Sequence, residues 1–166
     1  MTKYVNYVLT KLKETNIMVT KEEQSKIEIA DFGLNNFEEF GLGILTYVNN
    51  GLYCAKELVM LPNQICPEHR HPPFNDYLGK VETFRCRAGE VTLHVDSKKR
   101  KTEYAEDEIY TCDTVIKLYP GEQYTIQRDT KHWFKAGPDG AVISEFSSPS
   151  YDERDIFTNK HIKRVE

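Results

Sequence analysis

The sequence lacks the features of membrane-spanning, secreted and nucleic-acid-binding proteins. No apolar run approaches the length of about 20 residues that is needed to cross a bilayer, and the N-terminal segment has no signal-peptide core. The net charge of −4 provides no basic stripe that could neutralise phosphates. We therefore expect a cytoplasmic protein that binds neither a membrane nor nucleic acid.

Cysteine pairs at the spacing of redox or zinc motifs are also missing. The four cysteines stand apart from one another, at Cys54, Cys66, Cys86 and Cys112. In a cytoplasmic chain we expect such thiols to be reduced rather than paired. The sequence contains no internal repeat, and its 166 residues have the length of one domain. We expect residues 1–166 to form that single domain.

The first part of the chain has the apolar period of a helix. Apolar residues recur at steps of three and four near the N-terminus, and Thr20 followed by Glu22 and Glu23 is typical of a helix start. These patterns predict a helical extension over residues 1–35. We expect the extension to pack outside the remaining fold or at a dimer interface.

From residue 41 onward the pattern changes to that of short strands separated by turns. Turn signals lie at Asn50-Gly51, Ala88-Gly89, Pro120-Gly121 and Pro138-Asp139-Gly140. The predicted strands cover residues 41–48, 52–61, 81–87, 90–96, 108–118, 123–127, 132–136 and 141–146. Many short strands with regular turns are typical of a sandwich or a barrel. We expect a mainly β barrel over residues 40–147 and a C-terminal tail over residues 148–166.

Two histidines, His69 and His71, are spaced to share one face of a strand, because strand side chains alternate between faces. Glu82 follows after a proline-rich loop, and His132 follows a later turn-strand-turn unit. Three imidazoles and a carboxylate form a nitrogen and oxygen site that suits Mn, Fe, Co, Ni or Zn. The alternative is a pair of surface histidines at the edge of a loop. The ligand types favour a metal site but do not choose among these metals.

Longer segments resemble the D-lyxose isomerase family of cupin-type sugar isomerases. The similarity extends over roughly residues 40–160, and the segments that carry it are CAKELVMLPNQICPEHRHPP, GKVETFRCRAGEV, YPGEQYTIQRDTKHWFKAG, AVISEFSS and DIFT. The sequence departs from the general cupin pattern in the long gap of ten residues between His71 and Glu82. A loop of this kind is found in the lyxose isomerase group.

The resemblance implies a cupin-type β-barrel, or jelly roll, that is a homodimer and binds Mn²⁺ through His69, His71, Glu82 and His132. It also implies interconversion of D-lyxose and D-xylulose through an enediol. D-mannose and D-fructose are a plausible second pair, since mannose matches lyxose from C2 to C4. The substrate would be a small sugar.

The reaction needs a base that moves a proton between two carbons and a cation that stabilises the developing oxyanion. Glu145 lies among apolar residues of a predicted strand, and it is our candidate for the base. Either Lys56 or Glu57 must point inward from its strand, so Lys56 is the candidate for the cation. The alternative for Glu145 is an outward-facing strand position, which alternation alone leaves equally open.

Three further residues are candidates for substrate binding. Lys80 precedes Glu82 by two residues and would share its face, although a solvated loop position is equally open. Trp133 follows His132 and would line the pocket, although core packing is the more common role for such a residue. Asp155, in the segment DIFT, would close over the mouth of the site, and this expectation depends on the resemblance only.

Two other functions remain open from the sequence. A cupin dioxygenase could hold Fe(II) with the same ligands, although the lysines and Glu145 suit a polyol better than an apolar substrate. A non-catalytic sugar-binding cupin could also keep the metal. Loss of turnover without loss of binding on changing Glu145 would separate an isomerase from a binding protein.

Overall fold

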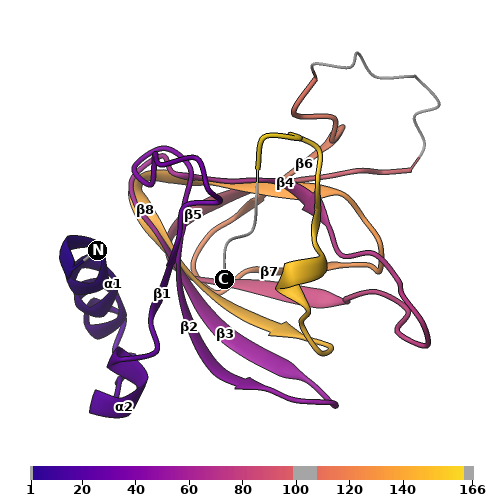
Figure 1. The fold of residues 1–166 in the computed structure, drawn as a ribbon. Coiled ribbons are helices and arrows are strands. Elements are labelled where there is room, and N and C mark those ends of the chain that lie inside the picture. The colour runs from indigo at the N-terminus through magenta and orange to yellow at the C-terminus, as the bar shows by residue number, and fades with distance from the viewer. Residues whose placement is uncertain (1, 99–107, 163–166) are drawn as a thin grey trace.

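The computed structural model describes residues 2–98 and 108–162, and its architecture is a single antiparallel sheet that curls around a core (Figure 1). The strand order is β1-β2-β3-β8-β4-β9, and β5 pairs with β6, β7 and β8. The expectation of a mainly β fold with an N-terminal helical segment is confirmed. Within the described ranges, no helix is both long enough and apolar enough to cross a membrane.

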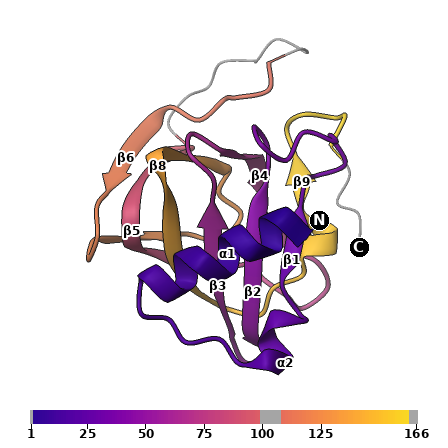
Figure 2. The same ribbon diagram turned by 90° about the vertical axis from the view of Figure 1, so that its left-hand side faces the viewer.

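The N-terminal helix α1 (Thr2–Glu14) lies across the outer face of the sheet, as Figure 2 shows. Its buried residues Val8 and Leu12 pack against the outward side chains Leu45, Val59 and Val142. This contact explains why the apolar stripe of the helix repeats at a helical period. The helix covers one part of the sheet from outside and supplies no residue to the cavity described below.

The second helix, α2 (Lys21–Gln24), begins at the predicted cap. The Thr20 side chain accepts from the backbone N–H of Glu23, and the Glu23 carboxylate accepts from the backbone N–H of Thr20, which forms a capping box. The predicted helical extension ends early, however, because Glu28–Ala30 form strand β1 and pair with β2. Pairing with the edge of the sheet makes this segment a strand, and local periodicity cannot predict such a long-range contact.

Three of the remaining strands follow the sequence prediction closely. Strands β2 (Leu42–Asn49) and β3 (Cys54–Met60) form the hairpin predicted at Asn50-Gly51. Strand β7 (Gln123–Ile126) follows the Pro120-Gly121 turn. Strand β4 (Ile65–Arg70) carries His69 but ends before His71, although the spacing of the two histidines predicted that they share a strand. Strand β6 (Thr114–Leu118) is shorter than predicted, since residues 108–113 are irregular. The C-terminal tail contains the short helix η1 (Asp152–Arg154) and strand β9 (Ile156–Phe157), and residues 163–166 of the predicted tail lie outside the described ranges.

Two predicted turns are wrong, because the strands on either side of each are continuous. Strand β5 runs over Glu82–Val95 and β8 runs over His132–Ser147, where two strands each were predicted. The turn signals at Ala88-Gly89 and at residues 138–140 coincide with shifts in the β5–β8 register. A β-bulge uses the same left-handed glycine that a turn uses, so the local signal is ambiguous. The glycines Gly89 and Gly140 both have a positive φ, of 71° and 79°.

The apolar core lies inside the curl and borders a polar cavity. Its largest buried side chains include Phe84, Phe134, Leu93 and Ile143. A cavity that opens to solvent is lined both by core residues and by histidines, lysines and carboxylates. The strands thus place a group of charged side chains beside an apolar wall.

A candidate metal centre and active site

Three histidines from neighbouring strand ends meet beside the cavity, and two of them, His69 and His71, line its wall. His69 lies in β4, His132 is the first residue of β8, and the two are directly paired in the register of these strands. His71 follows β4 by one residue. Each of the three is at most 8% exposed, and their ring centroids lie 4.4 to 5.3 Å apart. One ring nitrogen of each lies within 4.8 Å of the others, which is the arrangement of a metal site.

The outer ring nitrogen of each histidine contacts an acceptor. His69 Nδ1 lies 2.7 Å from the Pro67 carbonyl oxygen, and His132 Nδ1 lies 2.9 Å from that of Thr130. His71 Nδ1 lies 2.5 Å from Asp155 Oδ1. A carbonyl can only accept a hydrogen bond, so Nδ1 must carry the proton in His69 and His132. In the neutral ring the lone pair is then on Nε2. Metal-binding histidines in proteins are commonly oriented in this way, with a hydrogen bond at one ring nitrogen and the metal at the other.

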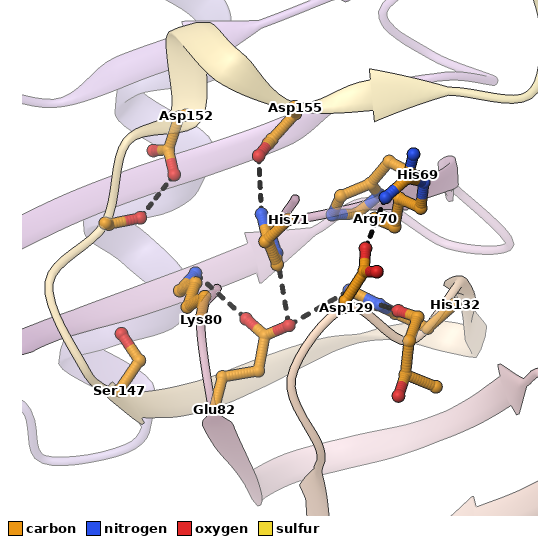
Figure 3. A network of polar contacts seen from close by, with 12 residues as sticks. His69, Arg70, His71, Lys80, Glu82, Asp129, His132, Ser147, Asp152 and Asp155 are labelled. Atoms are coloured by element: carbon orange, nitrogen blue, oxygen red, sulfur yellow. Dashed lines mark hydrogen bonds and ion pairs between the residues drawn. The ribbon is translucent and has the colours of Figure 1, made fainter. Parts of the chain in front are cut away.

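Glu82 completes this group from the first residue of β5 (Figure 3). Its Oε1 lies 3.2 Å from His71 Nε2 and 3.1 Å from His132 Nε2. Among the described residues, none gives these three buried atoms a hydrogen bond of good geometry. Buried polar atoms without such partners are costly, and a cation bound between them would satisfy all three.

The charge of the cavity wall also fits a divalent cation. The wall carries two lysines and four carboxyl groups, which are Lys56, Lys80, Glu82, Glu145, Asp152 and Asp155. When all six are ionised, the carboxylates exceed the ammonium groups by two charges. A divalent cation would balance this excess, and nitrogen and oxygen donors suit first-row divalent metals.

The protonation of the site follows from its neighbours. Burial opposes the charge of Glu82, but Lys80 and the histidines hold the pKa of its carboxyl well below its usual value. Burial, with His132 and His71 nearby, lowers the pKa of His69 well below its usual value, so this ring is neutral. Burial also opposes the charge of His71, yet Glu82 and Asp155 raise its pKa to about 9 in the ion-free protein. A cation at this site would therefore displace a proton from His71.

Lys80 joins the metal-ligand group to the candidate base. Its Nζ lies 2.9 Å from Glu82 Oε2 and 2.6 Å from Glu145 Oε1, and all three side chains are buried. Gly79 places the lysine there, since its φ is +92° and an added Cβ would lie 2.9 Å from the His71 carbonyl oxygen. Burial opposes the lysine charge, but Glu145 and Glu82 raise its pKa well above the usual value. Lys80 therefore stays protonated and donates to both carboxylates.

Glu145 points into the cavity from β8. Its side chain is 4% exposed and lines the cavity. Its Oε1 accepts a hydrogen bond from Ser147 at 3.2 Å and also contacts the ammonium group of Lys80. The alternative of an outward-facing position is therefore removed. In the β3–β8 register Glu145 is paired directly with Lys56, which also lines the cavity.

Lys56, the candidate cation, forms its ion pair with the C-terminal tail. Its Nζ lies 2.6 Å from Asp152 Oδ2 and 3.1 Å from Ser150 Oγ, both in the C-terminal tail. Lys56 was expected to be the stabilising cation and Lys80 a substrate-binding residue, and of these two lysines it is Lys80 whose ammonium group contacts Glu145. Glu57, the strand neighbour of Lys56, is also buried, but it faces Ser144 at 2.9 Å away from the cavity.

Two aspartates of the C-terminal tail line the cavity. One was not predicted from the sequence, and the other was predicted only from the family resemblance. Asp152 was not predicted, and its only sequence signal is an acidic run in a polar tail. Asp155 was expected at the mouth, and the structure places it both in the cavity wall and against His71. Glu68 anchors this part of the tail, since its buried carboxylate accepts from Thr158 Oγ1 at 2.6 Å.

The structure does not bring Trp133 to the cavity. Strand alternation turns His132 inward and Trp133 outward, where its ring stacks on His94 with centroids 3.7 Å apart. Tyr110 lies against the same ring at 4.4 Å. The substrate-binding role expected for Trp133 therefore has no support from its position.

The family comparison agrees with this geometry. The family model described as D-lyxose isomerase matches residues 1–166, the whole chain. The chain belongs to the D-lyxose isomerase family. A member from Thermosediminibacter oceani, named D-lyxose/D-mannose isomerase, is 54% identical over 93% of this chain and 88% of its own length. A D-lyxose ketol-isomerase from Cohnella laeviribosi is 49% identical over 92% of this chain and 87% of its own length.

Solved structures with low sequence identity share the fold of this D-lyxose isomerase family member. The ligand-free L-ribose isomerase of Cellulomonas parahominis is 14% identical and superposes with a TM-score of 0.76 over 97% of this chain and 92% of its own. The L-ribose isomerase of Geodermatophilus obscurus is 15% identical, with a TM-score of 0.73 over 98% and 95%. At such identities the similarity establishes the fold.

Proposed function

We propose that this protein is a metal-dependent aldose–ketose isomerase that interconverts D-lyxose and D-xylulose, with D-mannose and D-fructose as a second pair. Family membership supports the reaction class, and two relatives are named for D-lyxose. One observation carries the chemistry. A buried carboxylate, Glu145, shares one lysine, Lys80, with a carboxylate of the candidate metal group.

The proposed reaction moves one proton between two neighbouring carbons. Glu145 takes the proton from C2 of the open-chain aldose and returns it to C1, while the hydroxyl proton of O2 passes to O1, which leaves the carbonyl at C2. Lys80 cannot act as the base, because it stays protonated between two carboxylates. Its ammonium group instead orients Glu145 and provides positive charge where negative charge develops on the sugar oxygens. The apolar wall formed by residues such as Phe84 and Phe134 limits the access of water.

We propose that His69, His71, His132 and Glu82 bind the metal ion and that this ion is Mn²⁺. When bound, a divalent ion supplies Lewis-acid polarisation of the two reacting oxygens. The donor set supports this group of metals, because it contains nitrogen and oxygen ligands and no thiolate. The homodimer and the cytoplasmic location expected from the sequence remain predictions. Light scattering of the purified protein tests the first of them.

The experiment removes the metal and restores it. The protein is stripped with a chelator, Mn²⁺ is added back, and conversion of D-lyxose is followed by NMR in deuterated water. We expect ketose only with the metal present, with deuterium at C1, because a carboxylate base exchanges its proton with solvent. Absence of ketose with every first-row divalent metal would contradict the proposal. Ketose without deuterium would instead support a hydride shift, in which Glu145 has no role as the base, or a base whose proton is shielded from solvent.

A further inference from the structure

A second charged corner of the cavity lies apart from the metal ligands and contains Lys56, Asp152 and Ser150. Lys56 is 5% exposed, and its Nζ contacts Asp152 Oδ2 at 2.6 Å and Ser150 Oγ at 3.1 Å. The Ser150 hydroxyl also donates to the other carboxylate oxygen of Asp152. Lys56 and Asp152 both line the cavity that contains Glu145, and the Asp152 side chain is 26% exposed.

This corner is next to the proposed base. Lys56 and Glu145 are directly paired in the β3–β8 register and line the same cavity. Side chains paired in this way have Cβ atoms about 5 Å apart. A sugar whose reacting carbons lie against Glu145 therefore brings the hydroxyls of its following carbons to Lys56 and Asp152.

The corner is held in place by the fold. Ser150 donates its backbone N–H to Asn49 Oδ1 at 3.0 Å, and Asn49 Nδ2 donates to the Ser150 carbonyl at 2.9 Å. Tyr77 donates its hydroxyl to the Pro149 carbonyl at 2.7 Å. The tail segment that carries Asp152 is thus fixed to the β2–β3 hairpin and to the loop before β5. A polar group fixed in this way is able to discriminate between substrates.

The two charged groups have complementary hydrogen-bonding roles. Burial opposes both charges, yet Glu145 and Asp152 raise the pKa of Lys56, and Lys56 and Lys80 lower the pKa of Asp152. An ammonium group only donates, and a carboxylate only accepts. Neighbouring hydroxyls on a sugar can each donate and accept, so one of them matches the ammonium group and the other matches the carboxylate.

We propose that Lys56 and Asp152 form a subsite that binds two neighbouring hydroxyls of the aldose beyond its reacting carbons, with Asp152 as a specificity-determining residue. This inference depends on the proposed function, because the reacting carbons are placed by Glu145. It assigns a role to a tail residue that lies 96 positions from its partner in the sequence.

The test compares D-lyxose with analogues that lack the hydroxyl on C3 or on C4, using Asp152→Asn. We expect the wild-type protein to prefer D-lyxose over at least one analogue by tenfold or more in kcat/KM. In Asp152→Asn this preference should fall at least tenfold. Glu153→Gln is the matched control, since Glu153 is exposed on the same short helix and does not line the cavity. It should keep the wild-type preference.

A purely structural effect gives a different result, because a smaller folded fraction lowers the rates with all substrates equally. An unchanged preference ratio in Asp152→Asn would therefore overturn the inference. Should this variant not fold, Ser150→Ala removes one partner of Asp152 and should shift the ratio in the same direction.

Binding of the alditol formed by reduction of D-lyxose separates this inference from the proposed function, because the alditol cannot react. Calorimetry should show binding at least tenfold weaker in Asp152→Asn than in Glu153→Gln. Alditol binding with this difference, but without any isomerisation by the wild-type protein, would refute the proposed function and keep the subsite. Isomerisation with equal binding by both variants would refute the subsite alone.

Discussion

A single hydrogen-bond acceptor decides which nitrogen of each imidazole faces the site. His69 and His132 are oriented by carbonyls two residues earlier in their own segments, at Pro67 and Thr130. His71 is oriented by Asp155, which lies 84 residues away. Two of the three candidate histidine ligands are therefore held by local backbone, whereas the third depends on the docking of the C-terminal tail.

Glu145→Gln should separate an isomerase from a non-catalytic sugar-binding protein. The amide cannot take up the carbon-bound proton, so kcat for D-lyxose should fall by about 10²- to 10⁴-fold. Binding of the alditol should stay within a few fold, and so should Mn²⁺ affinity, because Glu145 lies outside the proposed ligand group. Steady-state kinetics and calorimetry on the same sample measure both. Unchanged turnover would remove Glu145 from the mechanism.

Glu57 gives a pH-dependent prediction away from the active site. Burial raises the pKa of its carboxyl above the usual value of 4.5, although Ser144 and Arg87 oppose the shift. The folded protein thus binds this proton more tightly than the unfolded chain. Stability contributed by Glu57 is lost as pH rises from about 4.5 through the folded pKa.

Glu57→Gln removes this titration and keeps an acceptor for the Ser144 hydroxyl. We expect the variant to have a higher free energy of unfolding than the wild-type protein near neutral pH and no such advantage at pH values below about 4.5. Urea unfolding at both pH values measures the difference, and the exposed Glu14→Gln is a control. A variant that is less stable than wild type near neutral pH would contradict the assignment.

Strands β5 and β8 are continuous because the residues that were predicted as turns form bulges within the strands. At Gly89, whose φ is +71°, an added Cβ would lie 2.0 Å from the Gly140 carbonyl oxygen. Both the left-handed backbone and this close approach require glycine. The bulge lies between the half of β5 that begins with Glu82 and the half that pairs with β6.

Gly89→Ala should therefore destabilise the fold by about 1 to 3 kcal/mol, the usual cost of a strained backbone position. The clash is with backbone atoms, so no side-chain movement can relieve it. Gly51→Ala is the matched control, since an added Cβ there meets no atom within 4 Å. Thermal unfolding of both variants measures the effect. Equal melting temperatures would show that the bulge tolerates a side chain.

The helical elements show which structural features local sequence patterns can predict. The cap at Thr20 was predicted and is present, because the capping box involves residues only three positions apart. The segment after it was predicted as helix but forms β1, because pairing with β2 overrides its weak local preference. Strand alternation predicts that His132 and Trp133 point to opposite faces of the sheet, but it does not predict which of the two faces inward.

The whole molecule should be more stable with metal than without it. The proposed ligands come from β4, the residue after it, β5 and β8, so an unfolded chain cannot present them together. A ligand that binds only the folded state at one hundred times its Kd adds about 2.7 kcal/mol of stability. The melting temperature should fall with chelator and rise again with Mn²⁺.

His132→Gln should lose this dependence on metal, whereas His161→Gln should keep it, because His161 is exposed in the tail. Differential scanning calorimetry at matched pH measures both. The same melting temperature for stripped and metal-loaded wild-type protein would show that the buried histidines do not bind the ion in the folded state.

The sequence alone determined the mainly β fold and the family and predicted the candidate metal group, because strand alternation, short-range turns and motifs of nearby residues carry these features, whereas for Glu145 it left the direction of the side chain open. Tertiary structure decided that Lys80 rather than Lys56 contacts Glu145, that Asp152 enters the cavity and that Trp133 stays outside. The physical reason is the distance along the chain. Lys56 and Asp152 are 96 residues apart, and only the register of the curled sheet and the docking of the tail bring them together.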